Sequence, residues 1–532
     1  MRLLNRPFAI VLIAGCAHAF SIAWPFSFGL TQGQSVWWLQ LLAISLLARQ
    51  LDAAVTKKQA AWVGWLFATV MQVATWWWLF ISLHTYGGLA APLAVVAIVG
   101  LAAFLAIYYA LACALFVAVA PVNKAGRAML FASLWLLAEL GRVALFTGFP
   151  WGEGGYAQLD GPFADLAKLI GVHGLTFGVA LLAFGVSSLR VKPRWSAAVV
   201  FGCVLLSVAV SSVLHIGQSG ISLYTVPHPM PTSLDPAPFN VSLLQGNIAQ
   251  DEKFQPSGGI PDALKWYQSQ LLAASTSLVV TPETSIPLLP NQLPEGYLDA
   301  LLNRFVKPAP GLPQTAALIG IPLGNSQQGY TNSAIALKPS DSKTIYQYDK
   351  HHLVPFGEFV HPLFKWFLSI VNMPLADFNS GSTSQPSLDW QGQRIAPNIC
   401  YEDLFGEELA ARFIDPASAP TMMVNISNIA WFGNTIAIDQ HLNISRMRAI
   451  EFERPMVRAT NTGATAIIDH TARVTHSLQR HTRGVLVGNV EGRSGITPYA
   501  WWAARFGLWP WWLLIAATVL IAARARFHWA KD

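Results

Sequence analysis

Charged residues are scarce in this sequence. Asp, Glu, Lys and Arg make up 12% of the 532 residues, while hydrophobic residues make up 53% and include 21 tryptophans. This composition excludes an ordinary soluble protein. Cysteine is also scarce, and Cys400 is the only one of the four cysteines that lies between roughly residues 218 and 505. Because it has no partner there for a disulfide, Cys400 is either a buried core residue or a reactive thiol.

Long apolar runs fill the first part of the chain and return near its C-terminus. A membrane-spanning helix needs about 20 apolar residues, and we interpret eight segments as such helices. Their approximate limits are 8–27, 33–49, 60–83, 89–120, 127–147, 164–189, 195–217 and 507–523. Glu139 and Arg142 lie three residues apart in the fifth segment, so we expect them to pair on one helix face.

Basic residues are unevenly distributed over the loops between these segments. Lys and Arg flank both termini and follow the second, fourth and sixth segments, whereas the alternate loops have almost none. The positive-inside rule therefore predicts two cytoplasmic termini and an extracytoplasmic stretch between the seventh and eighth helices. That stretch, residues 218–505, holds 19 Lys and Arg against 22 Asp and Glu, so the net charge of +6 comes from the loops. It gives no support to nucleic-acid binding.

The extracytoplasmic stretch has the pattern of an α/β domain. Five prolines between Pro227 and Pro238 indicate a linker. Short β-branched runs then alternate with helical runs at Ile260–Ser275 and Thr435–Phe452, which predicts a layered α/β fold. The predicted strands are Phe239–Leu244, Ser277–Val280, Ala316–Ile321, Ser333–Leu337, Arg394–Ile399, Thr421–Ile426, Thr465–Asp469 and Val485–Val490. The predicted domains are 1–217 (seven helices), 218–238 (linker), 239–498 (the α/β domain) and 499–532 (eighth helix and cytoplasmic tail).

Three short runs in this domain contain the chemistry. Glu283 follows a strand, Lys350 lies in Tyr348–Glu358, and Cys400 directly follows another strand. A thiol needs a neighbouring base, for which Glu283 is suited, and Lys350 would stabilise an oxyanion together with the N–H group of Tyr401. Taken singly, the glutamate and the lysine are more often solvated surface residues, and the cysteine is more often a core residue.

Together, these runs resemble the nitrilase superfamily, whose members use a Glu–Lys–Cys triad on an α-β-β-α sandwich. Within it, the chain is similar to the bacterial apolipoprotein N-acyltransferases, inner-membrane enzymes with eight spanning helices. The runs that carry the resemblance are Pro282–Glu283, Lys350–Glu358, Cys400–Glu402, Ser427–Gly433, Arg446–Ala449, Arg454–Asn461 and Phe146–Trp151. Ile429 departs from the polar residue expected at its position.

The resemblance implies roles for these residues. Glu283 would be the general base, Lys350 the oxyanion stabiliser and Cys400 the nucleophile, while Glu358 and Glu402 match supporting acidic residues. It implies ping-pong transfer of an acyl chain from a membrane phospholipid, through a Cys400 thioester, to the amine of a diacylglyceryl-cysteine on a lipoprotein. It further implies an integral inner-membrane protein, a periplasmic catalytic domain, a monomer, and neither cofactor nor metal.

An apolar stretch near the triad agrees with a lipid substrate. Pro362–Leu375 is too short to span a membrane and too apolar for a free loop, so we expect an arm that admits acyl chains. Trp366 and Phe367 of this arm, and Trp431 and Phe432, are candidate pocket residues, although packing roles are the alternative. A membrane-tethered amidase that uses water as acceptor, and a transporter with an inactive outer domain, are the rival functions.

Overall fold

The computed structural model describes residues 6–189, 236–339, 345–360 and 378–529. The chain divides into two compact units, a helical unit (Met1–Trp77, Val95–His228 and Leu508–Asp532) and a sheet unit (Trp78–Ala94 and Pro229–Gly507). The predicted seventh helix at 195–217, most of the linker at 218–238 and the arm at 362–375 lie outside the described residues.

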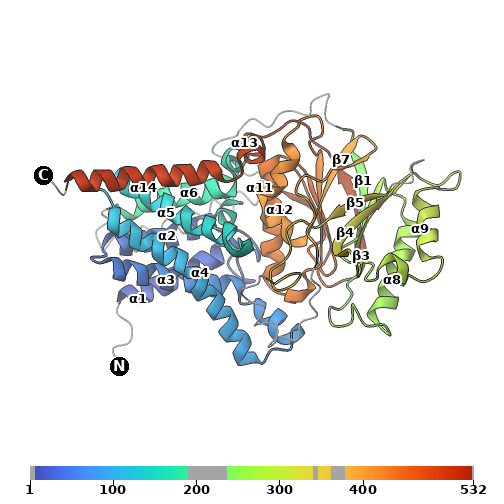
Figure 1. Ribbon diagram of the computed structural model, residues 1–532, viewed down its shortest axis with the longest axis horizontal. Helices are drawn as coiled ribbons and strands as arrows, with labels where there is room; N and C mark the ends of the chain where they lie inside the picture. Colours follow the sequence, from blue (N-terminus) through green and yellow to red (C-terminus); the bar gives the residue numbers. More distant parts are fainter. Residues whose placement is uncertain (1–5, 190–235, 340–344, 361–377, 530–532) are drawn as a thin grey trace. The chain divides into compact units, whose positions relative to one another are not determined.

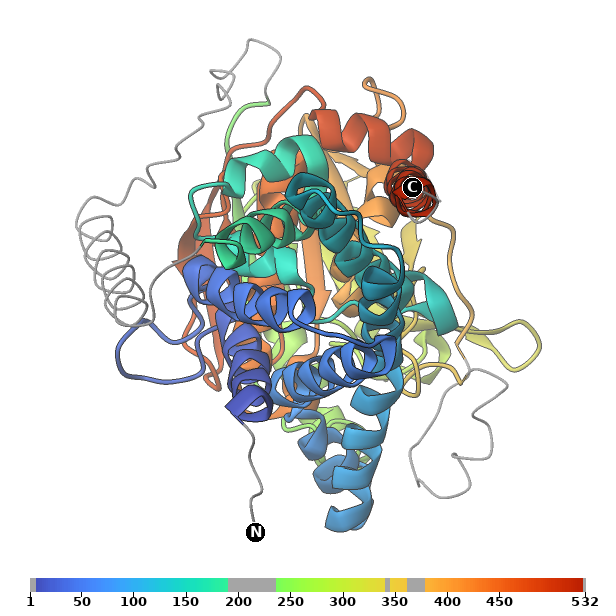
Figure 2. The ribbon, with the colours of Figure 1, turned by 90° about the vertical axis from the view of Figure 1, so that its left-hand side faces the viewer.

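Seven of the eight predicted apolar segments are helices in the described part of the chain. They are α1 (Arg6–Ile22), α2 (Trp37–Asp52), α3 (Lys57–Trp76), α4 (Ala91–Val119), α5 (Lys124–Ala144), α6 (Ala167–Ser187) and α14 (Trp509–Trp529). Two of these helices have a side-chain N-cap, Thr56 for α3 and Asn123 for α5. Helix α14 packs along α5 (Figure 1) and is seen end-on in Figure 2.

Three stretches of the described residues are long and apolar enough to cross a membrane. They are Ala91–Val119, Lys124–Thr147 and Ala164–Ser187, and a fourth is added if α13 (Pro498–Phe506) and α14 are counted as one broken span. Helices of this length and composition identify a membrane protein. The count of eight spans stays a prediction.

Glu139 and Arg142 are fully buried in the helical unit. Contrary to our expectation, no hydrogen bond or ion pair joins their side chains. Glu139 accepts hydrogen bonds from the Gly154 N–H (3.1 Å) and the Thr176 hydroxyl (3.0 Å). The Arg142 guanidinium donates to the carbonyl oxygens of Phe149 and Trp151 at 3.1 and 2.7 Å. The loop after α5 folds back over both side chains, so each charge stabilises that loop, which the sequence spacing alone did not indicate.

The described residues of the sheet unit form two six-stranded sheets. The first has the order β12-β1-β2-β3-β4-β5 and the second the order β11-β10-β9-β8-β7-β6. The central strands β1, β2 and β3, and likewise β7, β8 and β9, are parallel to one another, whereas the outer pairs are antiparallel. All eight predicted strands are present. The structure adds four strands that the sequence did not indicate, at 346–349, 388–390, 456–460 and 474–477.

The bounds of these strands are β1 (Phe239–Gln245), β2 (Leu278–Val280), β3 (Ala316–Asn325), β4 (Gly329–Leu337), β5 (Tyr346–Asp349), β6 (Leu388–Trp390), β7 (Gln393–Ile399), β8 (Met422–Ser427), β9 (Met456–Thr460), β10 (Ala466–Ile468), β11 (Val474–Ser477) and β12 (Gly484–Val490). The α-helices in the described part of this unit are α8 (Gly259–Ala273), α9 (Tyr297–Phe305), α11 (Gly406–Ala410), α12 (Ala437–Phe452) and α13.

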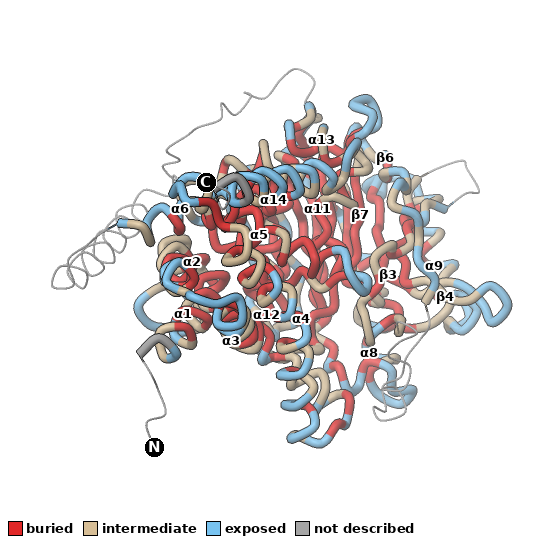
Figure 3. Tube along the Cα trace, turned by 60° about the vertical axis from the view of Figure 1, so that its left-hand side comes forward, coloured by how far each residue is buried: buried red, intermediate tan, exposed pale blue. Residues whose placement is uncertain are grey.

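Three hydrophobic cores place these elements in α-β-β-α layers. Successive strand residues face opposite sides of a sheet, and in β3 Leu318 packs against the second sheet while Ile319 packs against α8 and α9. The second sheet is covered on its outer side by α11, α12 and α13. Figure 3 shows the strands as largely buried. The α/β layers that the sequence predicts are therefore present.

A short segment between α3 and α4 belongs to the sheet unit. We expected one helix over 60–83, but α3 ends at Trp76 and a separate π-helix follows at Ile81–Tyr86. The Trp78 indole N–H donates to Gln440 Oε1 (3.0 Å), and the Ser82 hydroxyl donates to the Trp431 carbonyl (2.7 Å). These long-range bonds explain why the apolar pattern does not continue as a single helix.

Candidate active site

Glu283 lies in a tight turn that directly follows the buried strand β2. The turn passes over Gly320 of β3, where a Cβ atom would lie 2.2 Å from the Pro282 carbonyl oxygen, so only glycine fits. The Thr281 hydroxyl accepts a hydrogen bond from the Gly320 N–H (3.0 Å) and bonds to the Ser285 hydroxyl (2.6 Å). These contacts hold the carboxylate of Glu283 at the end of the sheet.

Lys350 follows β5 directly, and its ammonium group lies between two carboxylates. Lys350 Nζ is 3.2 Å from Glu283 Oε1 and 2.9 Å from Glu358 Oε1. The Asn332 side-chain amide, from β4, donates to the same two oxygens at 2.8 and 2.7 Å. The Asn428 N–H binds the other oxygen of Glu283 at 2.9 Å. Every bond to Glu283 favours its ionised form.

The charges in this cluster determine its protonation state. Burial favours a neutral Glu283, but Lys350, Asn332 and Lys253 hold its pKa below the ordinary value. Burial also disfavours the Lys350 ammonium, but Glu283 and Glu358 raise its pKa well above the usual range. Lys253 donates to the Glu283 carbonyl oxygen (3.2 Å), and burial lowers its pKa to about 8. Glu283 is therefore a carboxylate and Lys350 a cation at neutral pH.

Cys400 follows β7 and has a positive φ of 55°, an unusual conformation for a residue other than glycine. Burial raises the pKa of its thiol to about 12, and the Glu283 carboxylate adds to this rise while Lys350 opposes it. The charges of both Glu283 and Lys350 thus act on the sulfur. Because a thiol with this pKa is protonated at pH 7, it needs a base to react.

Glu402 is buried and organises the loops around the site. It accepts hydrogen bonds from the Tyr348 hydroxyl (2.8 Å), the His351 N–H (2.7 Å) and the Ile399 N–H (2.5 Å). In the sequence, Tyr348 and His351 lie on either side of Lys350, and Ile399 directly precedes Cys400. Glu402 therefore connects the strand end that carries the lysine to the strand end that carries the cysteine.

A buried ionic cluster lies behind the cysteine turn. Asp403, His441, Ser445 and Arg458 are at most 1% exposed. Arg458 Nη1 lies 3.1 Å from one oxygen of Asp403, and His441 Nε2 lies 3.0 Å from the other. Although burial disfavours the charge, His441 and Arg458 lower the pKa of Asp403. A buried pair of this kind becomes costly when one partner is removed.

We expect Asp403→Asn to reduce the free energy of unfolding by about 3–5 kcal/mol, because Arg458 would remain buried without a counter-charge. Asp299→Asn, an exposed substitution, should change it by less than about 0.5 kcal/mol. Denaturant titration of the purified protein in detergent measures both. Since the pKa of Asp403 is lowered by folding, its contribution is present above the unfolded value and disappears as the pH falls through the folded one. Equal midpoints for the two variants would contradict this role.

The structure thus brings together most residues that the sequence singled out, namely Glu283, Lys350, Glu358, Cys400 and Glu402. Trp431 and Phe432 are partly buried in a short helix at Ile429–Phe432, which begins next to the Asn428 N–H that binds Glu283. Their rings contact Tyr86 and Trp78 with centroid distances of 5.7 and 4.3 Å. Trp366 and Phe367 lie outside the described residues, so the arm stays a prediction.

Sequence reasoning missed three polar contributors, Asn332, Lys253 and the Asn428 N–H group. Asn332 carried a usable signal, because asparagine is a poor strand former and this one lies in β4 just before its apolar run Ala334–Leu337. Lys253 lies in an irregular segment with no pattern to mark it. A backbone N–H has no sequence signal at all.

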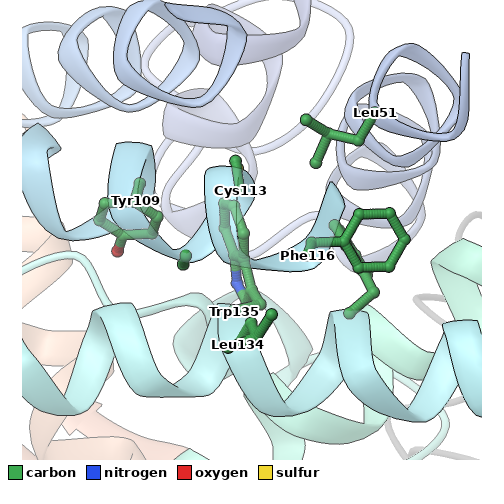
Figure 4. Close-up of a pocket in the computed structure, with 8 residues that line it drawn as sticks. Leu51, Tyr109, Cys113, Phe116, Leu134 and Trp135 are labelled. Atoms are coloured by element: carbon green, nitrogen blue, oxygen red, sulfur yellow. The ribbon is translucent and has the colours of Figure 1, made fainter. Parts of the chain in front are cut away.

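A small pocket in the helical unit is a poor alternative site. Its lining comes from α2, α4 and α5 (Figure 4) and consists of Leu51, Tyr109, Ala112, Cys113, Phe116, Phe131, Leu134 and Trp135. This lining carries neither a carboxylate nor a cation, so the Cys113 thiol there has no base. The triad region of the sheet unit is the stronger candidate.

Comparisons with known proteins cover nearly the whole chain. The model of the apolipoprotein N-acyltransferase N-terminal domain matches residues 15–185, and that of carbon-nitrogen hydrolase matches residues 240–498. An apolipoprotein N-acyltransferase of Verminephrobacter eiseniae is 55% identical over 513 residues, which are 93% of this chain and 92% of that protein. Those of Ralstonia nicotianae and Bordetella bronchiseptica are 42% and 38% identical, covering 92% and 97% of this chain and 89% and 96% of the respective relatives.

Proposed function

The chain belongs to the apolipoprotein N-acyltransferase family and is an acyltransferase that acts on lipoproteins; we propose that it works through a thioester on Cys400. The acyl donor would be a membrane phospholipid, and the acceptor the α-amine of an N-terminal diacylglyceryl-cysteine. The observation that carries this proposal is the Lys350 ammonium held between Glu283 and Glu358, with the charges of Glu283 and Lys350 acting on the thiol.

In the first half-reaction, the Glu283 carboxylate takes the thiol proton and the thiolate attacks the sn-1 ester carbonyl. The resulting oxyanion faces the Lys350 ammonium and the Tyr401 N–H, which stabilise the developing charge. When the intermediate collapses, the C–O bond of the ester breaks. The lysophospholipid leaves as an alcohol after receiving the proton from Glu283, and the acyl chain remains on sulfur.

In the second half-reaction, the lipoprotein amine attacks the thioester carbonyl through the same oxyanion site. Glu283 takes a proton from the attacking nitrogen, and the C–S bond breaks as the amide forms. The proton then returns to the Cys400 sulfur, so the enzyme regains its starting state. Glu283 and Lys350 thus act in both half-reactions, as expected for ping-pong transfer.

The two half-reactions can be separated by mass. We expect intact-mass analysis of the detergent-solubilised protein to show one added acyl chain after incubation with phospholipid. The adduct should be absent in Cys400→Ala, and a diacylglyceryl-cysteine peptide should discharge it with formation of the N-acyl peptide. No adduct on the active enzyme would contradict the thioester. Discharge only to water would favour the rival amidase.

We also propose the membrane arrangement that the loop charges indicate. Eight spans, two cytoplasmic termini and a periplasmic catalytic domain in the bacterial inner membrane are supported by Lys and Arg on alternate loops and by the apolar helices. The protein would act as a monomer. A reporter that is active only in the cytoplasm should be active when it is fused after Asp532. An inactive reporter would indicate the opposite topology.

A further inference from the structure

The carbonyl oxygen of Cys400, behind the reactive sulfur, is held by two side chains from neighbouring elements. Asn425 Nδ2, from β8, donates to it at 3.2 Å, and His441 Nε2, from α12, lies 3.2 Å away. Both side chains are almost completely buried. The proposed reaction assigns no part to either residue.

The hydrogen bonds of His441 determine which ring nitrogen carries the proton. Arg458 Nη2 lies 3.0 Å from His441 Nδ1, and a guanidinium can only donate, so Nδ1 accepts. Nε2 therefore carries the hydrogen and donates to its two neighbours, the Cys400 carbonyl and Asp403 Oδ1. The ionic cluster behind the turn thus fixes both the orientation and the tautomer of the imidazole.

We propose that His441 and Asn425 are positioning residues that aim the Tyr401 N–H at the oxyanion. The Cys400–Tyr401 peptide is planar, and in a trans peptide the C=O and N–H groups point in opposite directions. Two donors that fix the carbonyl therefore fix the direction of the N–H. This proposal rests on the proposed function, in which that N–H is the second oxyanion donor.

The unusual backbone of Cys400 makes such support necessary. A φ of 55° is unfavourable for a residue with a side chain, and it persists only where surrounding contacts enforce it. Asn425 is fixed in turn by its bond to Asn398 Oδ1 (2.6 Å), and Asp403 fixes His441. The carbonyl is thus held by groups that are themselves immobilised, the condition under which an oxyanion site is preorganised.

His441→Leu and His441→Gln test the proposal, since leucine removes the donor and the glutamine side-chain amide restores one near the Nε2 position. With phospholipid as substrate, we expect kcat for thioester formation to fall about 10–100-fold in His441→Leu, with KM within about threefold of the unaltered enzyme. His441→Gln should recover most of the loss. Alkylation of Cys400 by iodoacetamide forms no oxyanion, so its rate should change little in either variant.

A parallel fall in acylation and alkylation in His441→Leu would overturn the proposal, since the residue would then hold the thiol rather than the oxyanion site. Unchanged acylation would overturn it equally. If His441→Leu does not fold, Asn425→Ala undergoes the same pair of measurements with the same expected split. Failure of the proposed function is distinguishable, because the unaltered enzyme itself would then form no acyl adduct.

Discussion

Replacing Glu283 with glutamine is expected to slow thioester formation about 10³-fold at pH 7 while leaving the fold intact. A positioned general base contributes about 10²–10⁴-fold, and glutamine keeps the size of the side chain but cannot take a proton. Because the pKa of the Cys400 thiol is raised to about 12, the variant can react only through the small fraction of Cys400 that is ionised at that pH.

The pH profile separates this explanation from a structural one. The thiolate fraction grows about tenfold per pH unit below the thiol pKa, so the residual rate of Glu283→Gln should rise steeply between pH 7 and 9. The unaltered enzyme, whose Glu283 is ionised throughout, should not show this rise. Exposed Glu295→Gln is the matched control and should behave like the unaltered enzyme. A variant rate that is independent of pH would contradict the role of Glu283 as the base.

Lys350→Met should have an effect at least as large, about 10³-fold or more on acyl transfer. The variant loses an oxyanion partner, which alone costs about 10²–10³-fold. It also leaves Glu283 and Glu358 buried together without the cation between them, so one carboxylate becomes protonated and the base is weakened. We expect a loss of about 3–5 kcal/mol in unfolding free energy as well.

Lys350→Arg distinguishes charge from geometry. Arginine keeps a positive charge between the carboxylates but has a wide planar head group in place of a compact ammonium. Its stability should therefore lie near that of the unaltered protein while its acyl-transfer rate stays low. Lys307→Met, at an exposed position, controls for removal of a lysine. A full rate in Lys350→Arg would show that charge alone is sufficient.

The sequence predicted the residues whose signals are local. The buried strand Leu278–Val280 is a short apolar run, whereas Gln393–Ile399 mixes apolar and polar residues in a strand-like run, and the residues that follow such runs lie at the edge of a sheet. Glu283 and Cys400 were found in this way, and the resemblance to a known family added their order. Lys350 follows the strand Tyr346–Asp349, in which tyrosines alternate with polar residues, so no apolar run marks it.

Contacts between residues far apart in the sequence could not be predicted from it. The bond from Trp78 to Gln440 joins residues 362 positions apart, and the apolar run that contains Trp78 predicted only more helix. His441 lies 41 residues from Cys400, on a helix whose polar residues are distributed over all its sides, yet nearly all of them are buried. Only the fold determines which of these side chains meet.

The pairing of β1 with β12 has a consequence for synthesis. Their register runs from Phe239 opposite Val490 to Gln245 opposite Gly484. One of the two strands that pair with β1, the first strand of the domain, is therefore the last strand of the domain. At about 5–20 residues per second, translation of the chain between them takes roughly 12–50 s. During that interval β1 can pair only with β2, and its other edge stays open to unwanted partners. Synthesis must therefore deliver almost the entire domain before its first sheet can close.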